Sequence, residues 1–208
     1  GKTTECLKFL VNFNNFYPDI KVRKTIIISP IFHDIYSILK LKYDCLHFTS
    51  LEAAFDELDD GEVNTVCLVL IDDMASELVK SKLLEKIVTT MVRHHKLCIY
   101  ITSQSIFQSS SDSWRTVVKN SHVIVLMNTP RERKSAQILF CQLFGTGGNK
   151  KADFVLQEAL RENMKRYNNP YYAIYLNLSA DMPPQLRIIY DNLSQEPIVF
   201  CEPINRTI

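Results

Sequence analysis

The sequence predicts an α/β fold in which a mostly parallel β-sheet carries helices on both faces. Two uninterrupted apolar runs, Thr65–Ile71 and Leu97–Ile101, have the composition of central strands that are buried on both sides. Between them, Leu78–Val92 shows apolar pairs near the helical period, as expected for a helix that packs on the sheet. With 46% hydrophobic and 23% charged residues, the 208-residue chain is typical of globular proteins, and we expect residues 1–208 to form one domain.

The first sixty residues alternate predicted helices and strands. Apolar positions predict a largely buried helix over Thr4–Phe16 and further helices over Ile35–Leu41 and Leu51–Leu58. The β-branched run Lys24–Ser29 predicts a strand that ends at a proline turn, and Cys45–Phe48 predicts a short strand. Such alternation builds parallel sheets, because each helix returns the chain to the same edge.

The C-terminal half is also expected to combine strands and helices. His122–Met127 predicts a third buried strand. Helices are expected over Arg131–Phe144 and Ala152–Tyr167, on either side of a glycine-rich loop. The alternating segments Tyr171–Leu176 and Leu186–Tyr190 are typical of strands.

The chain opens with Gly1-Lys2-Thr3-Thr4, whose first three residues match the end of the phosphate-loop pattern G-x-x-x-x-G-K-[ST]. In such a loop the lysine reaches the β- and γ-phosphate oxygens and the threonine binds Mg²⁺. The tripeptide alone recurs by chance, but a predicted helix follows at once, and a helix N-terminus favours anions. Gly1, Lys2, Thr3 and Thr4 are therefore candidate nucleotide-binding residues, with Thr3 on the metal. Because no initiator methionine is present, we expect a fragment without the first strand and most of the loop, which binds nucleotide poorly.

Polar residues follow two of the predicted central strands. Asp72 and Asp73 come directly after the first apolar run, and Gln104 ends the second. Parallel strands bring their carboxyl ends to one edge of the sheet, where ligands bind. We predict that Asp72 holds Mg²⁺, directly or through water, that Asp73 orients the attacking water, and that Gln104 hydrogen-bonds this water or the γ-phosphate. The alternatives are an acidic helix cap for the aspartates and a surface position for the glutamine.

Arg93 precedes the second central strand, in the run Val92-Arg-His-His-Lys96. An arginine there is a candidate for a finger that reaches the γ-phosphate bound by a neighbouring subunit. The alternative is a residue that ends a helix, where the helix dipole favours positive charge.

Charge is unevenly distributed along a chain whose net charge is only +1. Residues 115–166 hold ten Lys and Arg against four acidic residues, whereas Leu51–Glu62 holds six acidic residues and no basic one. The basic window suits a phosphate backbone, and a solvated helical surface is the alternative interpretation. The six cysteines form no C-x-x-C pair, which favours a reducing compartment.

The order of these motifs resembles that of the FtsK/HerA superfamily of P-loop ATPases. More narrowly, it is similar to the genome-packaging ATPases of large DNA viruses, such as the poxvirus type, and of Maverick/Polinton elements. The likeness runs from Gly1 to about Tyr190, and most of it is carried by Val92-Arg-His-His-Lys-Leu-Cys-Ile-Tyr-Ile-Thr-Ser-Gln104 and by the stretch from Ser121 to Arg131. One departure is Asp73, because many relatives of the broader class place a glutamate there.

The resemblance implies a RecA-like core of sheet order 5-1-4-3-2, with the first strand missing from this chain. It also implies ATP and Mg²⁺ as cofactors, a homo-oligomeric ring, and sequence-independent pumping of double-stranded DNA into a capsid. The expected partners are DNA and viral capsid or portal proteins, without a membrane. The expected location is intracellular, in host cytoplasm or nucleus, or in the virion. The alternative function is a non-catalytic or degenerate nucleotide-dependent assembly module from an integrated viral element.

Overall fold

The structure, a computed structural model, describes residues 1–79, 81–106, 111–127, 133–144, 154–161, 165, 173–181, 188–189 and 199–200. The chain divides into two compact units, Gly1–Asn120 and Ser121–Ile208, each with its own β-sheet. Residues 1–208, which the sequence predicts to form one domain, therefore divide into two units. The first unit contains every candidate site residue.

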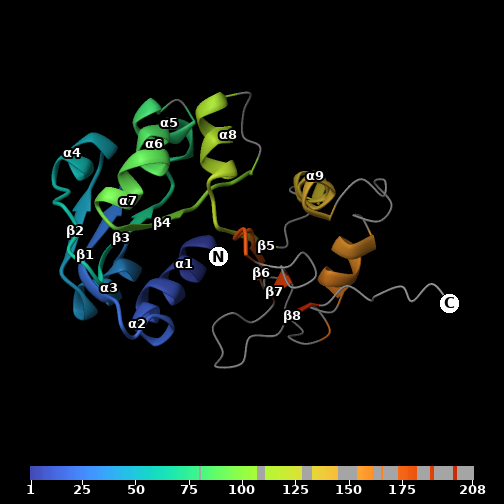
Figure 1. The fold of residues 1–208 in the computed structure, drawn as a ribbon, viewed down its shortest axis with the longest axis horizontal. Helices are drawn as coiled ribbons and strands as arrows, with labels where there is room; N and C mark the ends of the chain where they lie inside the picture. Colours follow the sequence, from blue (N-terminus) through green and yellow to red (C-terminus); the bar gives the residue numbers. More distant parts are fainter. Residues whose placement is uncertain are drawn as a thin grey trace. The chain divides into compact units, whose positions relative to one another are not determined.

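The sheet of the first unit has four parallel strands in the order β2-β1-β3-β4 (Figure 1). Its strands are β1 (Lys21–Ile28), β2 (Cys45–Phe48), β3 (Thr65–Ile71) and β4 (Leu97–Ile101). The predicted α/β class with parallel strands is confirmed. In the register, Ile71 lies beside Ile28 on one side and beside Ile101 on the other, so three strands end level with one another.

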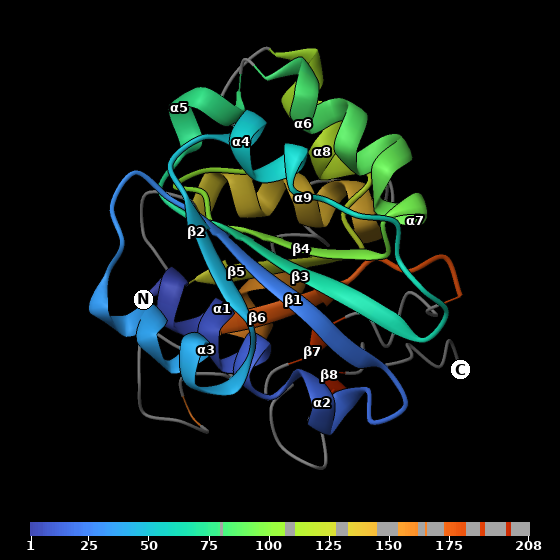
Figure 2. The same ribbon diagram turned by 90° about the vertical axis from the view of Figure 1, so that its left-hand side faces the viewer.

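Helices cover both faces of this sheet (Figure 2). One face carries α1 (Lys2–Val11), α2 (Phe13–Phe16), the short 3-10 helix η1 (Asp34–Tyr36) and α3 (Ser37–Lys42). The other face carries α4 (Leu51–Asp56), α5 (Ala75–Leu78), α6 (Lys82–Lys86), the π-helix η2 (Ile87–Met91), α7 (Val92–His94) and α8 (Asp112–Lys119).

Strand β3 is the centre of the core because both of its faces are buried. Cys67, Val69 and Ile71 pack with α4 to α8, whereas the residues between them, Leu68 and Leu70, pack with α1 and α3. All five side chains have no exposed surface. Full burial of one Leu or Ile side chain stabilises the fold by roughly 1.5–3 kcal/mol, so this apolar run anchors the unit.

Two predicted helices are interrupted. The helix expected over Thr4–Phe16 begins earlier, at Lys2, and is divided into α1 and α2 at Asn12. The helix expected over Leu78–Val92 is divided by the start of α6, where the Ser81 hydroxyl accepts a hydrogen bond from the Leu84 backbone N–H at 3.1 Å. A serine cap of this kind starts a new helix, which a purely apolar pattern does not reveal.

The second unit has an antiparallel sheet in the order β5-β6-β7-β8. It contains β5 (Val123–Met127), α9 (Arg133–Phe144), β6 (Ala173–Asn177), β7 (Ile188–Ile189) and β8 (Val199–Phe200), and residues 154–161 are helical. The prediction of a third buried strand at β5 is wrong on burial, since Val123 and Val125 are 46% and 38% exposed. An antiparallel sheet can leave one face uncovered. In sequence, the apolar residues of such a strand resemble those of a strand that is buried on both faces.

Several predictions concern residues outside the described part of the chain. They are the glycine-rich loop before residue 150, the ends of the helix expected over Ala152–Tyr167, and the basic residues Arg131, Lys150, Lys151 and Arg166. None of the helices that the structure describes combines the length and the apolar character needed to cross a lipid bilayer.

Candidate functional site

The candidate site is the edge of the first sheet at which β1, β3 and β4 end. Two backbone hydrogen bonds extend the strand ladders one residue beyond the apolar runs. The Asp72 N–H donates to the Ile28 carbonyl and the Thr102 N–H donates to the Ile71 carbonyl, each at 2.9 Å. Asp72 is therefore held beside Thr102, between the end of β1 and the end of β4.

Asp72 is a buried carboxylate whose two oxygens both accept hydrogen bonds. It is 1% exposed. The Tyr36 hydroxyl donates to Oδ2 at 2.6 Å, and the Thr102 hydroxyl donates to Oδ1. Burial and the bond to Asp72 raise the pKa of Tyr36, so this hydroxyl keeps its proton and remains a donor. The protein thus compensates the buried charge with two hydroxyl groups.

Asp73 lies next to Asp72 in the chain but points into solvent. Its φ of 55° is in the left-handed region, and its N–H donates to the Thr102 hydroxyl oxygen at 3.3 Å. Aspartate is one of the few residues that tolerate this conformation. The turn directs the exposed Asp73 carboxylate out of the edge, where it is accessible to water.

Gln104 lies three residues after the end of β4, at the same edge of the sheet, and is exposed. The flanking serines form a tight turn around it. The Ser103 hydroxyl accepts a hydrogen bond from the Ser105 N–H at 3.2 Å and donates to the Ser105 carbonyl at 2.7 Å. A local turn of this type holds the glutamine at its tip.

The start of α1 lies toward this edge as well. In Figure 2 the N-terminus and α5, which follows the two aspartates, lie on the left, and α7 lies on the right. Cys6 provides independent support, because burial raises the pKa of its thiol to about 12 and the charge of Asp72 adds to the rise. Gly1, Lys2 and Thr4 are exposed and Thr3 is half-buried. Cys6, in the second turn of α1, is thus close enough to Asp72 for its thiol to be affected by the carboxylate.

Arg93 is not part of this edge. It lies in the last turn of α7, directly before β4 begins, and is exposed. The seven residues of β3 span about 20 Å, which separates the carboxyl ends of the strands from their amino ends. Arg93 therefore lies at the amino edge, far from Asp72 of the same chain, in a position that also suits a cation at a helix C-terminus.

A network around Arg23 fixes the turn that follows Arg93. The Arg23 Nη1 atom donates to the Asp59 carboxylate. The Nη2 atom donates to the backbone carbonyls of Asp59 at 3.2 Å and His95 at 2.8 Å. The His95 Nδ1 lies 3.1 Å from the Asp59 carbonyl oxygen. Sequence analysis did not identify Arg23, because its partners are 36 and 72 residues away.

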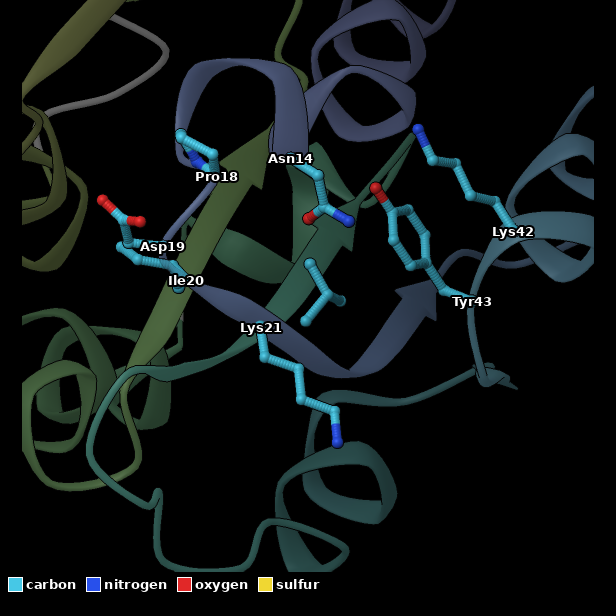
Figure 3. A pocket seen from close by; sticks show the side chains of 8 residues that line it. Asn14, Pro18, Asp19, Ile20, Lys21, Lys42 and Tyr43 are labelled. Carbon is cyan, nitrogen blue, oxygen red and sulfur yellow. The ribbon is translucent and has the colours of Figure 1, made fainter.

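Two cavities lie away from the aspartates. One of about 440 Å³ opens between α2, the start of β1 and the end of α3 (Figure 3), with Asn14, Lys21 and Tyr43 among its lining residues. The other, of about 520 Å³, runs between α1 and α3 and includes Thr4 and Lys8 in its lining. Neither is lined by Asp72, Asp73 or Gln104.

Asp72 is the carboxylate that the sequence analysis assigns to Mg²⁺, and in the structure it is buried with both oxygens accepting hydrogen bonds from hydroxyls. Among the residues that the structure describes, no group of three or more His, Cys, Asp or Glu side chains is placed to hold a metal. Magnesium does not need one, because it keeps several waters and is bound in nucleotide sites by one or two carboxylates together with phosphates. Asp72 supplies a carboxylate in a fixed position, and Thr3 is the hydroxyl that the sequence suggests.

Two residues of the site, Tyr36 and Thr102, were not identified from the sequence. Thr102 could have been found from the sequence, because it directly follows the second apolar run, just as Asp72 directly follows the first. Tyr36 has no such signal, because its contact with Asp72 depends on how η1 packs under the sheet edge. Comparisons with protein-family models, with curated proteins and with solved structures found no match.

Proposed function

We propose that this chain belongs to an ATP-hydrolysing motor that moves double-stranded DNA into viral capsids. The observation that carries the proposal is the fixed position of Asp72 at the carboxyl edge of a parallel sheet, together with Asp73, Gln104 and the start of α1. Ligands of open α/β sheets bind at this edge. The resemblance to FtsK/HerA-type packaging ATPases assigns a phosphate, metal or water role to the same residues.

In this proposal each residue has a separate task. Lys2 and the N–H groups at the start of α1 bind the phosphates, which the helix N-terminus favours. Thr3 and Asp72 would hold Mg²⁺, which supplies positive charge against the phosphates when bound. Asp73, exposed beside Asp72, accepts a hydrogen bond from the attacking water, and Gln104 orients the same water without adding negative charge.

The strand order supports this proposal. In the order 5-1-4-3-2, strands two, three and four are consecutive neighbours, as β1, β3 and β4 are here, whereas β2, which pairs with the outer side of β1, has no counterpart in that order. The first strand of that order lies beside the fourth. β4 is the edge strand of its sheet in the described part of the chain and is apolar, so it offers a free edge for such a strand.

The finger role proposed for Arg93 requires an assembly of several copies. A residue about 20 Å from the Asp72 edge of its own chain reaches a γ-phosphate only when a second copy supplies the nucleotide. We infer a homo-oligomeric ring, in which Arg93 of one copy completes the site of the next.

Basic residues of the second half are candidates for sequence-independent contact with DNA. Lys119 is exposed at the end of α8, and Arg133 and Lys134 are exposed at the start of α9. Contacts of this kind are made to phosphates, so binding would weaken steeply with salt. Capsid or portal proteins are the further partners that a packaging role requires.

A non-catalytic assembly module is the second candidate function. It is favoured by the hydrogen bonds of Asp72, because a buried aspartate that accepts two hydroxyl donors also satisfies a purely structural role. In that case the Asp73 carboxylate takes no part in a reaction. A substitution of Asp73 therefore distinguishes the two candidate functions.

The test is the Asp73→Asn variant of the protein. DNA-stimulated ATP hydrolysis should fall at least about a hundredfold, since a positioned base contributes about 10²–10⁴-fold to rate. Nucleotide affinity, measured by calorimetry, should stay within about threefold because Asp73 does not hold the phosphates. Asp56→Asn, an exposed aspartate on α4, is the matched control. Full turnover by Asp73→Asn would contradict the proposed enzyme, and absence of turnover in the unaltered protein would favour the assembly module.

A further inference from the structure

The groove of about 520 Å³ between α1 and α3 has apolar side chains on both of its walls. Leu7 and Val11 line it from α1, and Ile35 and Ile38 line it from η1 and α3. Leu7 is buried, whereas Ile35 and Ile38 are 44% and 47% exposed. Covering these exposed carbons would remove further apolar surface from water, which favours the binding of another chain segment. The groove therefore has the composition of a docking site for protein.

The outer side of η1 and α3 carries a row of apolar residues in addition to those that face the core. Tyr36 and Leu39 pack in the core and have no exposed surface. Ile35, Ile38 and Leu41 follow one another at intervals of three residues and are all exposed, Leu41 at 88%. A surface helix normally has polar residues on its outer side, because water covers it. A row of exposed apolar residues beside an apolar groove instead marks an interaction surface.

Lysines make one end of this surface basic. Lys40 and Lys42 are exposed at the end of α3, and Lys8 is exposed on the α1 wall of the groove. Glu5 pairs with Lys8 at 3.1 Å, and Asp34 lies at the start of η1. The end of α3 therefore keeps its positive charge. A segment that fits this surface carries acidic side chains next to an apolar one, because opposite charges across an interface favour association.

The same protein has such a segment in the loop between α4 and β3. This acidic loop, residues 57–63, has no basic residue and contains four exposed acidic ones, Glu57, Asp59, Asp60 and Glu62. It ends in Val63, whose side chain is 83% exposed. The helix α4 packs on one face of the sheet and α3 on the other (Figure 2), so the sheet separates the loop from the groove within one chain. Only a second copy can bring the acidic loop to the groove.

We propose that the acidic loop of one copy binds in the groove between α1 and α3 of a second copy. In this contact Val63 lies against Ile35 and Ile38, and the loop carboxylates lie beside Lys40 and Lys42. Two different surfaces meet, so each copy keeps one unused loop and one unused groove, and repetition builds a ring or an open chain of copies. The inference names the contact surfaces of the assembly proposed above and rests on that proposal, but it requires no nucleotide chemistry.

The test measures self-association of the full chain by sedimentation velocity at increasing protein concentration. One variant, Lys40→Glu with Lys42→Glu, makes the groove acidic. The other, Glu57→Lys with Glu62→Lys, makes the loop basic. Each variant alone should raise the dissociation constant at least about tenfold, because like charges then meet. An equimolar mixture of the two should associate as the unaltered protein does, since every groove then meets a loop of opposite charge. Lys119→Glu, at an exposed lysine that ends α8, is the matched control and should associate normally.

Restored association in the mixture cannot arise from misfolding, because each variant would carry its own defect into the mixture. Variants that are folded by circular dichroism and associate as tightly as the unaltered protein would overturn the inference and leave the proposed motor intact. A mixture that stays dissociated, or an unaltered protein that is monomeric at every concentration, would overturn it as well. A protein that associates through this contact but hydrolyses no ATP would contradict the proposed motor and support the inference.

Discussion

Arg23 is predicted to be the largest single polar contribution to the stability of the first unit at its amino edge. Its side chain is 13% exposed and donates hydrogen bonds to Asp59 and to the His95 carbonyl. Together these bonds fasten the segment after α4 and the turn before β4 to the start of β1. Arg23→Met removes the guanidinium while retaining most of the aliphatic stem, which isolates the hydrogen bonds from packing.

The expected cost follows from the exposure of each partner. The Asp59 side chain is 65% exposed, so the ion pair contributes less than about 1 kcal/mol. The two carbonyls receive charged donors, and such hydrogen bonds contribute about 1.5–3 kcal/mol each at most. The Arg23 Nε atom is buried without a hydrogen-bond partner among the described residues, which lowers the net gain. We therefore expect Arg23→Met to lose about 3 kcal/mol and Asp59→Asn less than about 1 kcal/mol.

Urea unfolding of the complete protein, followed by circular dichroism, measures both losses. With a slope near 2 kcal/mol per molar, Arg23→Met should lower the midpoint by about 1.5 M. The hydrogen bond from Arg23 holds the pKa of Asp59 below its usual 3.8, so its stabilising effect is present above that pH and is lost as the pH falls through the lowered pKa. If Asp59→Asn costs as much as Arg23→Met, the ion pair dominates and the reasoning from exposure is refuted.

Two further predictions concern packing and thiol chemistry. Gly61→Ala should cost about 1–3 kcal/mol of unfolding free energy, because a Cβ there would lie 2.5 Å from the Lys96 Cγ and 3.1 Å from the His95 carbonyl oxygen. Gly1→Ala, with no atom within 4 Å, is the control, and an equal effect on both would contradict the clash. Burial raises the pKa of the Cys67 thiol to about 11, so iodoacetamide at pH 8 should alkylate it about a hundredfold more slowly in native than in unfolded protein. Equal alkylation rates in native and unfolded protein would contradict the burial argument. The same pKa shift contributes stability to the folded state that is fully present below about pH 9 and is lost as the pH rises through about 11.

The central strands could be predicted because their sequence pattern has a single physical cause. Thr65–Ile71 and Leu97–Ile101 are predicted with the bounds that β3 and β4 have. Burial on both sides holds for β3, whereas β4 is an edge strand of its sheet among the described residues and only Leu97 in it is buried. The interruptions at Asn12 and Ser81 were missed. They depend on local caps and on how each helix crosses the sheet, which apolar periodicity does not encode.

The second unit shows where the same reasoning fails. β5 has the apolar composition of the central strands, yet it pairs antiparallel with β6 in a separate sheet. Composition reports that a segment can be buried, but it does not report which strand will pair with it. Pairing depends on contacts between residues about fifty positions apart, such as Val125 and Tyr175.

The different environments of Asp72 and Asp73 follow from the strand that precedes them. In β3 the even-numbered residues Leu68 and Leu70 face α1 and α3, and the ladder bond of the Asp72 N–H carries this alternation one residue further. Asp72 is therefore directed to the face of Tyr36 and the start of α1. Asp73 would face α5 and α8 if the strand continued, but its positive φ ends the strand and turns the carboxylate into solvent. A single backbone angle thus assigns the buried position to one aspartate and the water-accessible position to the other, although the two are neighbours in the chain.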